Sequence, residues 1–380
     1  MLQKDYLERA GHKVSVVAPA GDFAPSDSVV TYPSWPLTPS REFSFTMKIG
    51  SAIKVLNQKF SQGQPVDLVH VQADNWGALI GARFALEHNL PQVNTLHTNL
   101  EHALVKIVGK AASSAMVLGL STGFAFLSKQ PGCRPTTSAW KYLGMISANA
   151  DLILVPTLHF AKLAMKMGVA KDVQVLSNGV DDEFALAKIE PKSRKPKTTP
   201  VQFLWCGRIS HEKRIMQFMQ AIKIADLSGE VKIYGSGDQL AEAQEFVSAN
   251  GLANVVEFCG RLNHHDILLK MKEADVMVQT SSGFETQGMT VYEAGVMGTP
   301  SVICDRNIAL DLPAGSNWLV ADDSIEALAK TLKQAELDVA AGNTKVIDLR
   351  NQMAQSKLTG KALGYYQLAI NLHAEKSKEV

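Results

Sequence analysis

The sequence is poor in cysteine and has no excess of charge of either sign. Its cysteines include no C-x-x-C pair, and three of the four lie in apolar runs typical of strands, which suits buried thiols in a reducing compartment. The N-terminal stretch MLQKDYLERAGHK lacks the apolar core of a signal peptide, so we expect a cytoplasmic protein. With 38 Lys and Arg against 37 Asp and Glu, bulk charge gives no reason to expect nucleic acid as a partner. The cysteines are Cys133, Cys206, Cys259 and Cys304.

Long uncharged runs are also absent, with one exception. Residues 111–128, AASSAMVLGLSTGFAFLS, carry no charge and reach the lower length limit for a membrane span. Serine, threonine and glycine dilute the hydrophobicity of this run, and no second span follows it. The favoured interpretation is therefore a helix that is buried or faces an interface. Peripheral contact with the inner face of a membrane stays open as the alternative.

The order of apolar runs predicts two α/β domains. A chain of 380 residues is long enough for two cores. Apolar, β-branched runs that alternate with helical patterns indicate parallel sheets covered on both faces, hence two doubly wound domains. The expected limits are an N-terminal domain at 1–184, a linker at 185–200, a C-terminal domain at 201–357, and a helix at 358–380 that could pack back on the N-terminal domain. The runs are KVSVVAP, DLVHVQA, QVNTLHT, DLILVPT and VQVLSN, then VQFLWCG, VKIYGSG, VVEFCGR, DVMVQTS and PSVICD.

Two strand ends in the second half carry candidate anion-binding residues, because ligand sites of open parallel sheets lie beyond the carboxyl ends of strands. After VQFLWC, we expect Gly207 to allow a tight turn, while Arg208 and Lys213 supply two cations suited to a diphosphate. After VKIY, the turn at Gly235 lets the backbone approach a ligand, which is a weak signal by itself. Solvated basic residues on a surface loop are the alternative.

The stretch FETQGMTVYEAGVMGTP places two glutamates around the start of an expected helix. A helix that begins at about Met289 would point the N–H groups of Gly288, Met289 and Thr290 at a phosphate. Glu285 and Glu293 cannot bind that phosphate, so we expect them to accept hydrogen bonds from sugar and ribose hydroxyls. The alternative is that Glu285 caps the helix and Glu293 makes a surface ion pair.

These motifs together resemble the retaining glycosyltransferases of family 4, whose GT-B fold has two doubly wound Rossmann-like domains facing a cleft. The resemblance covers nearly the whole chain and includes RAGHKVSVVAP, DLVHVQ, TLHT, VPT and SNGVDDEF. It implies that the G-R-x-x-x-x-K element binds the donor diphosphate, and that the E-x7-E element binds the donor sugar through Glu285 and the ribose through Glu293. It also places His97, in TLHT, near the reacting sugar and reaching it from the other domain. The implied donor-binding set also includes Gly260, Arg261 and Leu262.

The resemblance implies transfer of a hexosyl group from a nucleotide-diphosphate sugar to a hydroxyl, with retention at the anomeric carbon. No cofactor is implied, and no D-x-D element is placed to hold a metal. The TYPSWPLTPSR segment and the ETQGMT variant are most similar to lipid-directed enzymes such as diacylglycerol glucosyltransferases and phosphatidylinositol mannosyltransferases. The open alternatives are a non-catalytic GT-B binding protein and a nucleotide-sugar epimerase.

One departure from the family pattern concerns the N-terminal domain. The family has a strand and a glycine-containing loop before the helix that precedes RAGHKVSVVAP, whereas this sequence begins inside that helix. The first strand of a doubly wound sheet is central, so we expect its absence to loosen or rearrange this domain. The transferase activity of this form is left open, and an upstream extension is expected to restore it.

Overall fold

The computed structural model describes residues 1–20, 26–36, 44–46, 48–60, 65–188, 195–283 and 285–379. The chain forms two compact units, unit 1 (Met1–Ser177 with Ser356–Val380) and unit 2 (Asn178–Gln355). Part of the predicted linker, part of the TYPSWPLTPSR segment and Phe284 lie outside the described residues. Each unit is a parallel α/β structure, so the predicted fold class is confirmed.

Unit 2 contains one parallel sheet of six strands in the order β11-β10-β9-β12-β13-β14. The strands are short and almost wholly buried at their centres, as expected for a sheet covered on both faces. The strands are β9 (Gln202–Arg208), β10 (Glu230–Ser236), β11 (Val256–Gly260), β12 (Val276–Gln279), β13 (Ser301–Ile303) and β14 (Trp318–Leu319).

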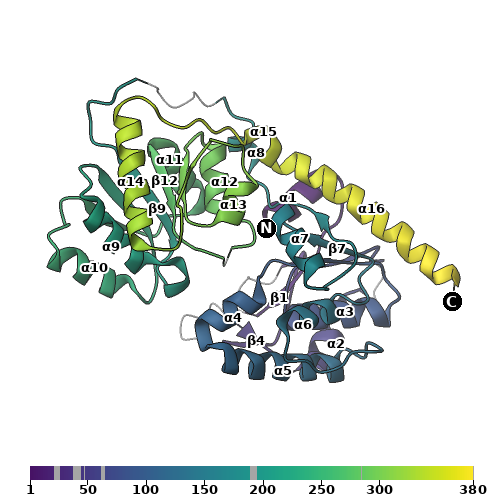
Figure 1. Ribbon diagram of the computed structural model, residues 1–380. Helices are drawn as coiled ribbons and strands as arrows, with labels where there is room; N and C mark the ends of the chain where they lie inside the picture. Colours follow the sequence, from purple (N-terminus) through teal and green to yellow (C-terminus); the bar gives the residue numbers. More distant parts are fainter. Residues whose placement is uncertain are drawn as a thin grey trace. The chain divides into compact units, whose positions relative to one another are not determined.

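Helices cover both faces of the unit 2 sheet (Figure 1). One core joins the sheet to α9, α10 and α14, and a second joins it to α8, α11, α12, α13 and α15. The helices are α8 (Asp182–Ala185), α9 (Ile215–Ala225), α10 (Leu240–Ala249), α11 (His264–Glu273), α12 (Met289–Val296), α13 (Arg306–Leu310), α14 (Ile325–Ala340) and α15 (Arg350–Met353), with a 3-10 turn at His211–Lys213.

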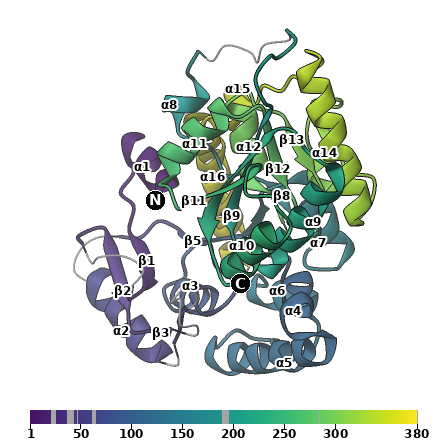
Figure 2. The ribbon, with the colours of Figure 1, turned by 90° about the vertical axis from the view of Figure 1, so that its left-hand side faces the viewer.

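Unit 1 divides its parallel strands between two sheets. Four strands form a sheet in the order β5-β6-β7-β8, and β1 pairs with β2 alone. Helix α2 packs against β2 and against α3, the helix that contacts β5 of the larger sheet (Figure 2). The strands are β1 (Val16–Pro19), β2 (Val29–Tyr32), β5 (Val69–Val71), β6 (Gln92–Thr95), β7 (Leu152–Val155) and β8 (Gln174–Val175), with the antiparallel pair β3 (Trp35–Pro36) and β4 (Ser44–Phe45).

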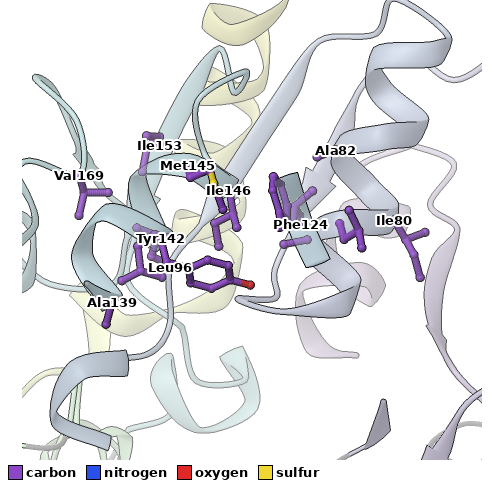
Figure 3. Packing of buried hydrophobic residues seen from close by; sticks show 14 of the residues in the cluster. Ile80, Ala82, Leu96, Phe124, Ala139, Tyr142, Met145, Ile146, Ile153 and Val169 are labelled. Atoms are coloured by element: carbon purple, nitrogen blue, oxygen red, sulfur yellow. The ribbon is translucent and has the colours of Figure 1, made fainter. Parts of the chain in front are cut away.

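The larger sheet of unit 1 has a core on each face. Ile153 and Val155 of β7 face a core built with α3, α5 and α6, while Leu152 and Leu154 face the opposite side, as the alternation of a strand requires. Figure 3 shows part of the first core, where Phe124 and Tyr142 meet edge to face with ring centroids 6.4 Å apart. The helices are α1 (Leu2–Arg9), α2 (Ile49–Phe60), α3 (Trp76–Glu87), α4 (Leu100–Val108), α5 (Lys110–Leu127), α6 (Ala139–Ile146), α7 (Leu158–Lys166) and α16 (Gln355–Glu379).

The C-terminal helix α16 covers the second face of this sheet. Ala362 and Ala369 are buried against Leu152 and Leu154 in the same core. The small alanine side chains let the helix approach the sheet closely, and the Tyr366 hydroxyl lies 2.8 Å from Nδ1 of His70 on β5. Residues from Ser356 onward therefore belong to the fold of unit 1.

Helix α5 contains the uncharged run and lies beside α4 and α6 at the periphery of unit 1 (Figure 2). Only a stripe that includes Ser113, Val117 and Phe124 is buried, and Phe126 is 83% exposed. Among the described residues this is the one helix long and apolar enough to cross a membrane, and 22% of it is buried. The expectation of a buried helix therefore holds only for that stripe, because the opposite side of α5 is apolar and exposed.

Candidate functional site

The predicted donor residues of unit 2 gather at the carboxyl end of its sheet. The chain runs from β9 outward to β10 and β11, then returns to the other side of β9 with β12. Ligands of doubly wound sheets bind at this kind of reversal, because the loops after the two central strands diverge and leave space. Arg208 ends β9, and the loop that contains Glu285 follows β12.

Gly207 has a different role from the tight turn that the sequence suggested. It lies within β9, and the chain turns only after Arg208, in the 3-10 turn His211–Lys213. Both Gly207 and Gly235 have φ of 154°, which side chains disfavour, and a Cβ on Gly235 would lie 1.9 Å from the Gly207 carbonyl oxygen. The glycines therefore allow the ends of β9 and β10 to approach each other closely.

Lys213 and Glu285 form an ion pair between the loops that follow β9 and β12. Ser281 Oγ also donates to the same Glu285 oxygen, at 3.2 Å. The backbone of Lys213 is fixed because its carbonyl accepts a hydrogen bond from the buried Thr280 hydroxyl at 2.5 Å. The structure thus brings together two residues that are 72 positions apart in the sequence and that we assigned to diphosphate and sugar.

Arg208 is the last residue of β9 and lies partly in solvent. Its side chain is 44% exposed, and Nη1 is 3.9 Å from Oε1 of Glu212. Glu212 in turn accepts a hydrogen bond from Ser210 Oγ at 2.6 Å. An exposed ion pair of this kind contributes little to stability, so the exposed guanidinium places a positive charge near the end of β9 without being needed for the fold.

The loop between β12 and α12 is held by side chains that sequence reasoning missed. Asp305, buried after β13, accepts a hydrogen bond from the Gly283 amide at 2.7 Å. Gln287 is also buried, and its amide makes three hydrogen bonds with Asn178, to the backbone N–H, the side chain and the carbonyl. Asn178 belongs to the SNGVDDEF motif. These contacts give that motif a structural role, because it anchors the loop that presents Glu285.

Helix α12 begins at Met289, as predicted, after Gly288 in a left-handed conformation with φ of 71°. A side chain on Gly288 would be strained by that φ and would meet Ile308 Cδ1 at 2.5 Å. In the described part of the chain, the N–H groups of Gly288, Met289 and Thr290 have no acceptor. They form the partly positive helix start that the sequence predicted.

Glu293 lies within α12 and is 7% exposed. Its Oε1 is 2.8 Å from Nε2 of His264, the first residue of α11. The hydrogen bond to this carboxylate is the main reason that the pKa of His264 is raised. Glu293 also affects the half-buried Cys206 thiol, because desolvation first and the carboxylate charge second raise the pKa of Cys206. His264 was not predicted, although the two histidines in NHHD at a helix start are a signal.

Gly260, Arg261 and Leu262 follow β11 at the same end of the sheet. Gly260 has φ of 73°, and both Arg261 and Leu262 are exposed. No hydrogen bond or ion pair between described residues joins them to either glutamate, so their assignment to the donor site stays a prediction. Among the described residues, no group of three His, Cys, Asp or Glu side chains is placed to hold a metal ion.

His97 lies in unit 1, in the loop that follows β6. Leu96, directly before it, is buried in the core with Tyr142 and Ile146 and so anchors this loop (Figure 3). Burial lowers the pKa of His97, which favours a neutral imidazole. Burial and the nearby His97 lower the pKa of His70 to about 3.

Asp74, after β5, supports the His97 loop from a second strand. Its carboxylate accepts hydrogen bonds from the Thr98 side chain and from the backbone of His97 and Thr98. Burial nonetheless raises the pKa of Asp74 to about 6, and its Oδ1 is buried with no hydrogen-bond partner among the described residues. Asp74 and His97 are therefore linked at the carboxyl end of the unit 1 sheet, a link that the sequence did not reveal.

The matches to known families divide the chain near the boundary between unit 1 and unit 2. Residues 4–184 match the model of Glycosyltransferase Family 4, and residues 187–356 match the model of Glycosyl transferases group 1. The 2-deoxystreptamine N-acetyl-D-glucosaminyltransferase of Streptomyces fradiae is 32% identical over 254 residues, which cover 62% of this chain and 53% of that protein. Glycogen synthase of Mycobacterium tuberculosis is 27% identical over 134 residues, or 34% of this chain and 31% of the synthase. The chain thus spans about a third to half of the length of these relatives.

Solved structures show the same fold at low identity. Sucrose-phosphate synthase from Thermosynechococcus elongatus aligns with a TM-score of 0.64 at 17% identity, over 99% of this chain and 91% of that one. An Anabaena protein, HepE, solved in complex with UDP and glucose, aligns with a TM-score of 0.63 at 16% identity, over 89% and 86%. The two adjoining family matches together span most of the chain, and with the parallel α/β architecture they show that it has the two-domain GT-B fold of glycosyltransferases.

Proposed function

We propose that the chain transfers a hexosyl group from a nucleotide-diphosphate sugar to an acceptor hydroxyl, with retention at the anomeric carbon. The observation that carries this proposal is the Lys213–Glu285 pair, which lies where the order of the strands reverses. The start of α12, whose first N–H groups have no acceptor among the described residues, follows the same loop. A cation, a helix start and two carboxylates in one unit suit a molecule that joins a diphosphate to two groups of hydroxyls.

Each donor residue has a separate role in this proposal. Lys213, Arg208 and the start of α12 offset the negative charge that develops on the leaving diphosphate, which is the usual main contribution to such catalysis. Glu285 accepts hydrogen bonds from the donor sugar and Glu293 from the ribose. The reaction replaces the bond between the anomeric carbon and the diphosphate with a bond to the acceptor oxygen, and it releases nucleoside diphosphate and a proton.

His97 acts in the proposal as a neutral hydrogen-bonding group on the acceptor side. Its lowered pKa supports this role, because an uncharged imidazole can both donate to and accept from hydroxyls at neutral pH. Two relatives add support for the substrate class. HepE was solved with UDP and glucose, and the Streptomyces fradiae relative is named for the transfer of an acetylated hexosamine.

The donor proposal is tested with purified protein and a panel of UDP- and GDP-hexoses. Calorimetry measures binding, and release of nucleoside diphosphate in the presence of candidate acceptors measures turnover. We expect Lys213→Ala to lower turnover by at least about a hundredfold, because it removes a charge that contacts the leaving group. Lys223→Ala, an exposed lysine of the same unit bonded to Asn250, is the matched control and should not change turnover.

Three outcomes distinguish the alternatives. Turnover that is the same in Lys213→Ala and in the wild type removes the diphosphate role from this lysine. Binding without turnover for every acceptor supports a non-catalytic GT-B protein instead. A product with inverted configuration, seen as the coupling constant of its anomeric proton, refutes retention.

We further propose that the acceptor is presented at a membrane surface, and that α5 makes the contact. Phe126 is 83% exposed on the side of the helix opposite the buried stripe, and Met116 and Leu118 are 46% and 43% exposed. Lys110 and Lys129, at the two ends of this helix, are also exposed. Apolar side chains flanked by lysines suit the interface of an anionic bilayer.

Vesicle sedimentation tests the membrane proposal. The protein should bind vesicles that contain phosphatidylglycerol, and salt should weaken the binding because charges are screened over roughly 8 Å at physiological ionic strength. Phe126→Ser should weaken binding, whereas Leu310→Ser, which removes a 69% exposed leucine from unit 2, should not. Equal binding by the two variants, or no sedimentation of the wild type, leaves a soluble acceptor as the better explanation.

A further inference from the structure

His264 and Glu293 form a contact between the first turn of α11 and the middle of α12. Asn263 caps α11, since its side-chain oxygen accepts a hydrogen bond from the Asp266 amide at 2.9 Å. This cap fixes the start of the helix and therefore the backbone from which His264 projects. The imidazole Nε2 lies 2.8 Å from Oε1 of Glu293, and the two residues are 29 positions apart in the sequence.

The two partners differ greatly in exposure. The Glu293 side chain is 10% exposed, whereas the His264 side chain is 60% exposed. A nearly buried carboxylate is costly unless hydrogen bonds satisfy it, and His264 satisfies one of its oxygens. The described residues supply no hydrogen bond to the other oxygen, Oε2. The Oε1 oxygen of Glu293 is thus held by His264, while the Oε2 oxygen can accept further hydrogen bonds.

The charged groups that face His264 are both acidic. Glu293 contributes most, and Asp181, the cap of α8, adds a smaller attraction for a protonated ring. Cys206, in β9, also interacts with Glu293, and its raised pKa means a neutral thiol. The proton on His264 therefore responds chiefly to how much negative charge Glu293 offers it.

We propose that His264 is a positioning residue of the donor site, which holds Glu293 so that Oε2 receives the hydroxyls of the nucleoside. This inference rests on the proposed ribose contact of Glu293. A bound diol donates to the same carboxylate and competes with His264 for its charge. Binding therefore favours loss of the extra proton from His264, and donor affinity falls as the pH drops through the pKa of this histidine.

The experiment measures the affinity of UDP-glucose, or of GDP-mannose if only that donor binds, by calorimetry from about pH 5.5 to about pH 8.5, a range that brackets the ordinary histidine pKa. The wild type is compared with His264→Ala, His264→Gln and His265→Ala. His265 is the matched control, because it is the next residue of the same helix, and its ring nitrogens lie 3.6 Å from Glu183 and 3.5 Å from Asp266.

We expect His264→Ala to weaken donor binding by about fivefold to tenfold, the loss of one hydrogen bond to a carboxylate. His264→Gln should restore most of the affinity, since its amide N–H reaches the same oxygen, while the pH dependence seen in the wild type should disappear. His265→Ala should behave as the wild type does. If His264 served only to stabilise the fold, His264→Gln would not restore the donor affinity while removing its dependence on pH.

The outcomes separate this inference from the proposed function. If the wild type binds a donor and His264→Ala binds it equally well at every pH, the positioning role is wrong and the donor site stands. If His264→Gln keeps the pH profile of the wild type, another group titrates and the inference also fails. If the wild type binds no nucleotide sugar, both the proposed function and this inference are overturned.

Discussion

In unit 2 all strands belong to one six-stranded sheet, whereas in unit 1 the parallel strands are divided between the pair β1–β2 and a sheet of four. Among the described residues, β1 pairs only with β2, and β5 pairs only with β6. A strand edge without a neighbour leaves backbone groups to water. The comparison suggests that the two units present their site residues with different rigidity.

The units also differ in the partners of their partly or wholly buried carboxylates. Each donor-site glutamate of unit 2 has a basic partner, Lys213 for Glu285 and His264 for Glu293. Asp74 of unit 1 has only uncharged hydrogen-bond donors, and burial raises its pKa. Each of these two glutamates is therefore stabilised as a carboxylate by a basic side chain, while unit 1 holds a carboxyl group that costs stability when ionised.

The largest expected effect is a loss of stability in unit 2, caused by a substitution at Gly235. Gly235→Ala would place Cβ 1.9 Å from the Gly207 carbonyl oxygen, a backbone atom that cannot rotate away. We expect the substitution to lower the free energy of unfolding of unit 2 by about 3 to 5 kcal/mol, as measured by urea denaturation. Gly260→Ala is the control. Its Cβ would meet no atom within 4 Å, so only the cost of φ at 73° remains, about 1 to 2 kcal/mol.

If Gly235→Ala lowers the free energy of unfolding no more than Gly260→Ala does, the ends of β9 and β10 are not packed closely enough for a Cβ on Gly235 to clash with the Gly207 carbonyl.

Hydrogen exchange sharpens the comparison between the sheets. We expect amides of β1 and β2 to exchange at least about a hundredfold faster than those of β9 and β10, because a two-stranded ribbon is marginally stable by itself. The exposure of Val17 in β1, at 38%, points the same way. Strands β6 and β7 serve as an internal control for unit 1. Equal protection of the amides of β1 and β9 would contradict this prediction, because it would mean that the β1–β2 pair opens no more readily than the six-stranded sheet of unit 2.

The smallest effect concerns Asp74, whose carboxyl pKa rises from 3.8 to about 6 on folding. Below about pH 3 the group is protonated in both states and contributes nothing. Between about pH 3 and pH 6 the unfolded chain loses this proton first, so rising pH lowers the stability of the folded state, by up to about 2 to 3 kcal/mol. Asp74→Asn should remove this loss, which shows as a difference from the wild type in urea denaturation at pH 8 that is absent at about pH 3.

The exposed Asp172 of the same unit provides the control, as Asp172→Asn. An equal pH response in the two variants would mean that Asp74 is not the group whose burial matters.

Much of the candidate donor site could be predicted from the sequence because its signals are local. The start of α12 follows from a glycine and an apolar helical pattern, and the placement of Arg208 and Glu285 at carboxyl ends follows from the strand order of a doubly wound sheet. The prediction of a turn at Gly207 was wrong, because this glycine lies within β9 and the chain turns only after Arg208. Contacts such as Asp305 with Gly283 could not be foreseen, because they join residues from different loops.

The sequence by itself determined the two series of strands and helices, the apolar character of α5 and the spacing of the two glutamates. Only the tertiary structure decided which partners those residues have: Lys213 for Glu285, His264 for Glu293, and Asp74 for the His97 loop. It also decided that unit 1 divides its sheet. The physical reason is that periodicity and glycine positions act within a few residues, whereas ion pairs and strand pairing depend on how distant segments pack.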